Sequence, residues 1–210
     1  MAERLNVNPT RMELLALKDQ IETARRGHKL LKDKRDELMR VFLNLVDKTR
    51  ELREKVEKNL SEAFASFLMG KAVMSEDTLE SAIMFSDTEL EVAFDKTTIM
   101  GVPVAEFTAD AEQMEGEMYP YGFTETSGDL DNFMRIMTET LPDLVKLAEV
   151  EKSLLLLAEE IEKTRRRVNA LEYVLIPRQQ ETIRYITMKL DERERSNLTR
   201  LMKIKDMIRS

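Results

Sequence analysis

The sequence has no cysteine, no tryptophan and a single histidine among its 210 residues. Without cysteine there can be no disulfide framework, no thiolate metal site and no cysteine nucleophile. The one histidine, His28, has no second histidine or cysteine with which to complete a zinc site. A packed, hydrogen-bonded His28 is therefore favoured over a metal ligand or a general base. We expect neither a metal nor another cofactor.

Other sequence signatures of catalysis are also missing. The chain contains no glycine-rich loop ending in Lys-Ser or Lys-Thr, and its acidic stretch lacks the Asp spacing and glycine of a calcium loop. No run of eighteen apolar residues occurs, and the polar start of the chain has no apolar signal core. We therefore expect a non-catalytic, soluble, cytoplasmic protein without direct membrane insertion.

Charge and heptad periodicity are abundant: charged residues make up 35% of the chain. Alternate steps of three and four residues through the N-terminal part give thirteen positions, and ten of these are apolar. These positions are Leu14, Leu17, Ile21, Ala24, His28, Leu31, Arg35, Leu38, Phe42, Leu45, Thr49, Leu52 and Val56. A sustained apolar repeat of about 3.5 residues is typical of a left-handed coiled coil.

The same stepping recurs in the C-terminal part, where Thr164 is the only polar member. The positions are Leu147, Val150, Leu154, Leu157, Ile161, Thr164, Val168, Leu171 and Leu175. Two such stretches in one chain satisfy each other when it folds back on itself. The sequence thus predicts a mainly α fold, a long antiparallel two-helix left-handed coiled coil, with one arm over residues 1–69 and the other over residues 131–210.

Polar residues interrupt the predicted seam at His28, Arg35, Thr49 and Thr164. Polar seam residues cost stability but can fix register, so we interpret these four as alignment devices. A pairing of Thr10 with about residue 205 would place both chain ends at one tip. The same register would bring Thr49 near Thr164, and Arg35 near Pro177.

The middle of the chain, residues 70–130, has a different character. Five of the six glycines lie there, and fourteen acidic residues against two basic ones give a net charge of −12. An acidic middle argues against a nucleic-acid-binding protein. Alternating apolar residues predict a short β-hairpin over about residues 89–108, with Pro103 on an edge strand. Tyr119, Tyr121 and Phe123 are expected to anchor this region onto the coiled-coil end.

Several single residues predict local features of the arms. Asn8 is expected to cap the first helix, with Pro9 at its first position. Gly27 is interpreted as a place where a second backbone approaches closely, with a hinge as the alternative. The apolar seam reaches Leu175 and resumes at Ile183, so we expect a bend or local unwinding at Pro177.

Three stretches carry a specific resemblance. They are NPTRMEL over 8–14, GHKLLKDKRDEL over 27–38 and EEIEKTRRRVNALE over 159–172. In order and spacing, the two arms resemble the D subunit of the archaeal and vacuolar-type rotary ATPases over nearly 150 residues. The resemblance implies a central rotor shaft that couples ATP synthesis or hydrolysis to H⁺ or Na⁺ transport. It would lie on the cytoplasmic side, peripheral to the membrane.

The resemblance also implies partners. They are the F subunit of the central stalk, the catalytic A and regulatory B subunits around one tip, and a C (d-type) subunit above the membrane ring. Candidate tip contacts with the catalytic hexamer are the polar and basic residues Asn8, Thr10, Arg11, Arg200, Lys203 and Lys205. Arg165, Arg166 and Arg167 point in three directions about 100° apart on a helix, so at least one is expected to face a partner. The alternative is that all three pair with Glu162, Glu172 and solvent.

A different class stays open from architecture alone. A coiled coil with a β-hairpin is also similar to prefoldin-type chaperone subunits and to scaffold proteins. That alternative predicts exposed apolar residues at helix ends and stable self-oligomers, whereas a shaft predicts a monomer that needs the F subunit.

Overall fold

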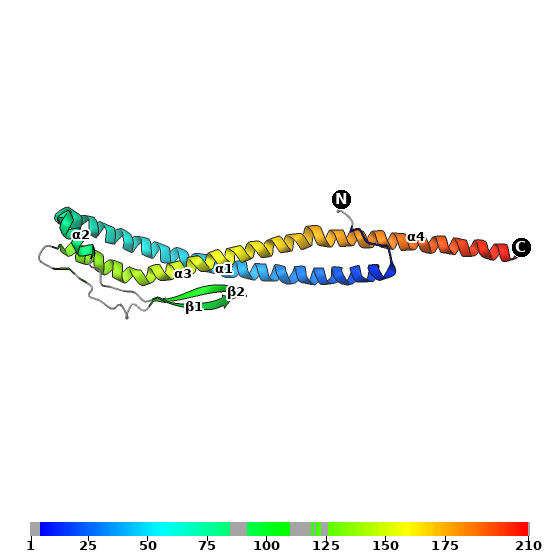
Figure 1. The fold of residues 1–210 in the computed structure, drawn as a ribbon, viewed down its shortest axis with the longest axis horizontal. Helices are drawn as coiled ribbons and strands as arrows, with labels where there is room; N and C mark the ends of the chain where they lie inside the picture. Colours follow the sequence, from blue (N-terminus) through cyan, green and yellow to red (C-terminus); the bar gives the residue numbers. More distant parts are fainter. Residues whose placement is uncertain (1–4, 85–91, 110–118, 120, 123–125, 210) are drawn as a thin grey trace. The chain divides into compact units, whose positions relative to one another are not determined.

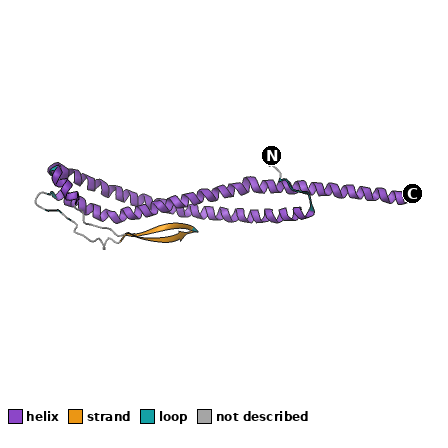
Figure 2. Cartoon of the chain, viewed as in Figure 1, coloured by secondary structure: helices purple, strands orange, loops and turns teal. Residues whose placement is uncertain are grey.

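The computed structural model describes residues 5–84, 92–109, 119, 121–122 and 126–209. Helix α1 spans Arg11–Val73, α2 spans Glu76–Met84, α3 spans Gly128–Ala170 and α4 spans Ile176–Arg209. A π-helical turn, Leu171–Leu175, joins α3 to α4, and two strands, β1 (Val92–Ile99) and β2 (Val102–Ala109), lie between α2 and α3. Figure 2 shows a mainly helical chain with one β-hairpin among the described residues, as the sequence predicts.

Helix α1 begins two residues later than expected, at Arg11 rather than at Pro9. The hydroxyl of Thr10 accepts a hydrogen bond from the Glu13 amide at 3.2 Å, which makes Thr10 the capping residue. Asn8 is instead part of the preceding turn, where its carbonyl accepts the Thr10 amide at 2.9 Å. The expectation of a cap at Asn8 is therefore wrong, because that turn holds residues 8 to 10 outside the helix.

The apolar seam of both arms is buried as the periodicity predicts. All thirteen predicted positions in α1 are buried or half-buried, with Leu38 fully covered. In the C-terminal arm eight of the nine positions are covered to the same degree, and Leu157 is fully buried. The exception is Leu175, at the end of the π-helical turn, which is 39% exposed. Burial of this seam is the main source of stability, at ~25 cal/mol per Å² of apolar surface removed from water.

The chain divides into two compact units, and both arms contribute to each. One unit combines Met1–Glu37 with Ile161–Ser210, and the other is Leu38–Glu160. In the first, His28 contacts Glu172 and Arg11 pairs with Glu194. As residue numbers fall along α1 they rise along the partner helix, so the arms are antiparallel there.

The second unit shows the same antiparallel order. Arg53 pairs with Glu151 at 2.8 Å, and Ser66 accepts a hydrogen bond from Asn132 at 2.9 Å. Lys55 pairs with Asp143 at 2.6 Å between these two levels. Within each unit the arms thus form the antiparallel helix pair that the sequence predicts.

The predicted register, however, is wrong. A pairing of Thr10 with about residue 205 would place His28 beside about residue 187, whereas His28 contacts Glu172. The offset is about two heptads, a shift that leaves an apolar repeat of 3.5 residues in phase. Arg35 consequently lies at the level of Thr164 rather than of Pro177.

The C-terminal arm changes its winding just before Pro177. The Ile176 amide donates to the Leu171 carbonyl, five residues back, which closes a π-helical turn. Proline has no amide with which to continue an α-helical ladder, and its ring crowds the carbonyl four residues earlier. Pro142, by contrast, lies inside α3, so the helix begins well before it.

The two strands form a tight antiparallel hairpin. Ile99 pairs with Val102 across the two-residue turn Met100–Gly101, and both turn residues have positive φ, 52° and 84°. This is the backbone geometry that two-residue hairpins favour. Residues 89 to 91, the first part of the predicted hairpin, lie outside the described residues.

A small core joins α2 to the ends of the two arms in the second unit. Leu79, Ala82 and Leu130 are buried there, and Phe67 and Phe133 stack at a ring distance of 5.1 Å. Tyr121 packs against the same core, as expected of an anchor. Its hydroxyl donates to Asp131 at 2.8 Å, and burial, together with this bond, raises the pKa of Tyr121 above its ordinary value. Phe123 lies outside the described residues.

Gly27 does not accommodate a close helix approach. A Cβ built at Gly27 would meet no heavy atom within 4 Å beyond its own helix turn, so the interpretation of a close approach is wrong. We expect Gly27→Ala to raise the free energy of unfolding by ~1 kcal/mol, because alanine restricts the unfolded chain and favours helix. Gly101→Ala is the control, since φ of +84° should make it destabilising. Urea unfolding followed by circular dichroism measures both; a destabilised Gly27→Ala would contradict the account.

The π-helical turn gives a second prediction. In Pro177→Ala the new amide can donate to the carbonyl of Tyr173, so we expect the turn to revert to α-helix and shift the phase of α4. A crystal structure of the variant, or the exchange rate of the amide at 177, measures this. Persistence of the π-helical turn in the variant would show that Pro177 is not its cause.

Candidate functional site

The described residues hold no group of three or more His, Cys, Asp or Glu side chains that could bind a metal ion. Across the same described ranges, no helix combines the length and apolarity needed to cross a membrane. The chemically distinctive features of the described ranges are the polar positions of the seam and the apolar side chains that the helices leave exposed.

The four polar seam residues each find local partners or cover. His28 is mostly covered, with its Nε2 3.3 Å from Glu172, as expected of a packed histidine. Arg35 donates to Asp36 at 2.6 Å, and the hydroxyl of Thr49 donates to the Leu45 carbonyl of its own helix. Thr164 is 1% exposed. Their role in setting the register stays a prediction, although the particular pairings expected for Thr49 and Arg35 are not those observed.

Two further polar residues occupy the seam after the π-helical turn. Gln179 and Thr182 are buried, at 5% and 0% exposure, and Ile186 follows them. Ile183, the position at which the apolar pattern was expected to resume, is only half-buried. Sequence reasoning missed Gln179 and Thr182 because it took up the seam again at the apolar Ile183, although steps of four and three from Leu175 lead to these two residues.

Thr182 holds an N-terminal segment that sequence reasoning did not anticipate. Its hydroxyl accepts the Leu5 amide at 3.1 Å and donates to the Arg178 carbonyl at 2.7 Å. Near the start of α1, Arg193 donates to the Pro9 carbonyl at 3.0 Å. Residues 5–10 therefore run back along α4 from the level of Arg193 to the level of Thr182, and we call them the N-terminal strap.

The predicted tip is formed differently from the expectation. Arg11 pairs with Glu194, so α1 begins at that level of α4. Residues Arg195–Arg209 extend α4 beyond this point by about 22 Å at ~1.5 Å per residue, and every one of them is exposed. We call this segment the α4 overhang; Figure 1 shows it as the red end of the chain. Asn8, Thr10 and Arg11 therefore do not share one tip with the other three candidates, Arg200, Lys203 and Lys205, which lie on the overhang.

The overhang also carries an apolar stripe. Its exposed apolar side chains are Leu198, Leu201, Met202, Ile204, Met207 and Ile208. Spacings of three and four along this set place most of them on one helix face. An exposed apolar face of this kind marks a surface for a partner rather than for water.

The three consecutive arginines divide their roles. Arg166 pairs with Glu162 on its own helix, while Glu172 contacts His28. Arg165 and Arg167 are exposed and make no ion pair with any residue that the structure describes. A partner contact through Arg165 or Arg167 stays a prediction.

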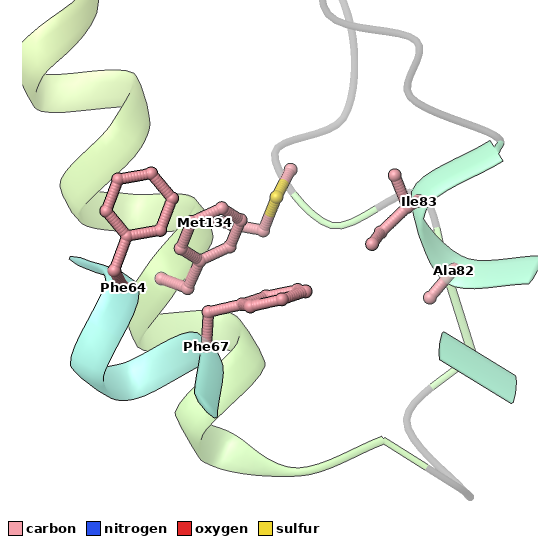
Figure 3. Close-up of a pocket in the computed structure, with 6 residues that line it drawn as sticks. Phe64, Phe67, Ala82, Ile83 and Met134 are labelled. Atoms are coloured by element: carbon pink, nitrogen blue, oxygen red, sulfur yellow. The ribbon is translucent and has the colours of Figure 1, made fainter. Parts of the chain in front are cut away.

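A second apolar surface lies at the end of the helix pair that carries α2. Phe64, Phe67, Phe133 and Met134 face Ala82 and Ile83 of α2 around a hollow of about 280 Å³ (Figure 3). Phe64 is 56% exposed at its rim. Leu68, Met69 and Val73, also at the end of α1, are exposed as well. The hollow holds no polar group suited to a reaction, so we interpret it as a binding surface.

Two long antiparallel helical arms around an apolar seam, with a short β-hairpin between them in the sequence, define a coiled-coil protein. Residues 13–206 match the model of the ATP synthase D subunits. The chain therefore belongs to this family of ATP synthase D subunits.

Similar curated proteins agree with the family assignment. The D subunit of a V-type ATP synthase in Acetivibrio thermocellus is 56% identical over 206 residues, covering 97% of this chain and 92% of that protein. Proteins of the same description in Clostridium botulinum (strain Alaska E43) and Fusobacterium nucleatum are 55% and 54% identical, each covering 98% of this chain and 97% of theirs. Membership of this family disfavours the prefoldin-like alternative, although exposed apolar residues at a helix end are common to both.

Gln179 gives a test of the polar seam. Its Oε1 is buried without a hydrogen-bond partner among the described residues, while its Nε2 lies 3.4 Å from Gln20. We expect Gln179→Leu to raise the free energy of unfolding by ~1 kcal/mol, because it removes a buried unsatisfied carbonyl. The exposed neighbour provides a matched control, Gln180→Leu, which should change stability by less than ~0.5 kcal/mol. A clear loss of stability in Gln179→Leu would mean that this amide makes a necessary interaction.

Proposed function

We propose that this chain is the central rotor shaft of an A/V-type ATPase. In this role it turns inside a hexamer of catalytic A and regulatory B subunits and transmits torque toward an ion-translocating ring in the membrane. ATP synthesis or hydrolysis is thereby coupled to H⁺ or Na⁺ transport. The chain itself performs no catalysis and acts on the cytoplasmic side, peripheral to the membrane.

The observation that carries the proposal is the continuous helix α1 of 63 residues, packed along its whole seam against the C-terminal arm. A shaft must resist twisting, and a helix pair with interdigitating seam side chains resists it because side chains in a close-packed interior cannot slide freely. Contacts across the arms in each unit, such as the His28 contact with Glu172 and the ion pair of Arg53 with Glu151, support a shaft whose two helices keep a fixed register.

The α4 overhang is the part of the chain best suited to enter the hexamer. A single helix about 10 Å wide fits a narrow central opening more easily than a helix pair. Its apolar stripe offers a low-friction contact, because apolar contacts are not directional and are not exchanged for specific hydrogen bonds as the shaft turns. Arg200, Lys203 and Lys205 supply the basic contacts that we predicted for the tip.

The remaining surfaces are assigned to the other partners. The apolar hollow at α2 is proposed to seat on the C (d-type) subunit above the membrane ring. Arg165 and Arg167, exposed on α3, are proposed as contacts along the shaft, where the F subunit would bind. Their planar guanidinium groups suit bidentate pairing with partner carboxylates.

The direct experiment is reconstitution with the A, B, F and C subunits. We expect a stoichiometric complex whose ATPase turnover depends on this chain. A chain that forms stable self-oligomers and ignores the other subunits would overturn the proposal.

Removing the overhang separates assembly from rotation. We expect a chain that ends at Arg195 to keep the unfolding free energy of the full chain, because the deleted residues are exposed and contribute no seam contact. The truncated chain should bind the F subunit normally and lose most of the coupling between ATP hydrolysis and ion transport. Transport measured in proteoliposomes checks this; full coupling after truncation would contradict the role of the overhang.

Two matched triple variants then identify the contact type. One replaces Leu198, Leu201 and Ile208 with serine, and the other replaces Arg200, Lys203 and Lys205 with serine. If the apolar stripe forms the bearing, the first should reduce coupling more than the second. The opposite order would assign the bearing to the basic residues.

A further inference from the structure

The two edges of the β-hairpin differ, and the difference follows from one hydrogen bond. The Phe107 amide donates to Oε2 of Glu149 on α3 at 3.1 Å, so this amide points away from β1. In an antiparallel ladder the inward and outward positions alternate along each strand. Because Phe107 pairs with Phe94, the outward positions of β1 are Phe94, Lys96 and Thr98.

The edge of β2 is closed. Its outward positions are Pro103, Ala105 and Phe107, which are the alternate residues counted back from Phe107, whose amide contacts Glu149. Pro103 has no amide to donate, and the Phe107 amide is already bound to a carboxylate from α3. An edge interrupted in this way is a poor template for another strand.

The edge of β1 is open. Seven of its eight residues are exposed and Ile99 is half-buried, and among the described residues β2 is the only strand that pairs with it. Phe94, Lys96 and Thr98 therefore present a row of outward amides and carbonyls. Strand addition requires an unprotected sheet edge, and in this hairpin the edge of β1 offers one whereas the edge of β2 does not.

Side chains around this edge indicate the chemistry of the added strand. On one face Phe94 is 56% exposed and lies 5.9 Å from the Phe107 ring, with exposed Val92 beside the pair. On the other face Asp95 pairs directly with Glu106, and like charges at directly opposite positions are destabilising. An added strand with an apolar residue beside Phe94 would cover the Phe94 ring. A basic residue of the same strand beside Asp95 would neutralise the Asp95 charge.

A second copy of this hairpin is a poor occupant. Antiparallel pairing of two β1 edges must match outward positions with outward positions. In the two registers with the longest overlap, Asp95 would oppose Asp95 or Lys96 would oppose Lys96. Either arrangement places like charges directly opposite each other.

We propose that the outer edge of β1 is a docking site for an extended, basic segment of another subunit of the ATPase, which adds a third strand to the hairpin. The proposal rests on the proposed function only in taking its partner from that complex. Main-chain hydrogen bonds from Phe94, Lys96 and Thr98 give the affinity, and Asp95 selects a basic residue.

Residue-resolved hydrogen exchange tests the proposal, comparing the isolated chain with the assembled A, B, C, D and F complex. We expect the outward amides of Phe94, Lys96 and Thr98 to exchange rapidly in the isolated chain and to slow at least about ten-fold in the complex. Ladder amides at Asp95 and Thr97 should already be protected in both. Outward amides that are equally fast in both states, or already slow in the isolated monomer, would overturn the proposal.

A matched pair of substitutions adds an independent readout. Lys96→Pro removes one outward amide without touching a ladder hydrogen bond, whereas Lys96→Ala changes the same side chain and keeps the amide. We expect Lys96→Pro to abolish the protection of Phe94 and Thr98 in the complex, and Lys96→Ala to preserve it. Equal protection in both variants would mean that no strand is added at this edge.

The outcomes separate the two proposals. A complex that assembles and hydrolyses ATP with an unprotected β1 edge refutes strand addition and leaves the shaft intact. Failure of the chain to join the complex refutes the shaft itself. Protection accompanied by dimerisation of the isolated chain, measured by light scattering, would replace the partner strand with a second copy.

Discussion

The constraint on which this structure depends is the apolar seam with its period of 3.5 residues. A helix with a narrow apolar stripe is not stable alone in water, and each arm buries its stripe only against the other. That pairing accounts for the length of α1 and for the antiparallel order of the contacts between the arms. It also accounts for the position of the hairpin in the sequence, between the two arms. Single apolar residues such as Leu15, Leu30 and Leu43 stay exposed along the arms. Groups of exposed apolar residues lie on the α4 overhang, around the hollow at α2 and on the hairpin.

The seam changes character at the π-helical turn. Up to Val168 most of its positions are apolar, whereas beyond the turn the two polar residues Gln179 and Thr182 are buried in it before Ile186. A polar seam binds more weakly, but it offers hydrogen bonds that an apolar seam cannot. The hydroxyl of Thr182 accepts a hydrogen bond from the Leu5 amide. The N-terminal strap therefore lies against α4 just before α4 continues without α1 beside it. The weakened pairing and the strap together bring the two-helix region to an end and leave α4 to proceed as a single helix.

The sequence was sufficient for the kind of fold and insufficient for its register, and the reason is physical. Periodicity reports which face of a helix is buried, and all thirteen positions predicted in α1 were correct. It cannot choose between registers two heptads apart, because such a shift returns every apolar residue to an equivalent position. In the observed register His28 contacts Glu172, an ordinary surface residue in the sequence that apolar periodicity does not single out. Gly27 was misinterpreted for a related cause: glycine in a helix marks a possible close approach, but only the positions of its neighbours decide whether one occurs. Arg200, Lys203 and Lys205 lie on the α4 overhang, apart from Asn8, Thr10 and Arg11, because the register differs from the predicted one. Their contact with a hexamer stays a prediction.

The hairpin shows how a surface element can be held in place and still be available to a partner. A two-stranded sheet is marginal by itself, and here Val102 and Val104 are buried while Glu149 fixes the backbone of β2. The Glu149 contact closes the edge of β2, and the burial of Val102 and Val104 closes one face. The hairpin is therefore held in place through β2 and stays accessible at the edge of β1. An open edge would ordinarily invite aggregation, but the charges at Asp95 and Lys96 penalise pairing with an identical edge. The same charges do not penalise a strand of complementary charge. Selectivity at this edge therefore arises from repulsion between two copies of the hairpin as much as from attraction to a partner. The outward backbone groups are neutral, so by themselves they would not specify which strand binds there.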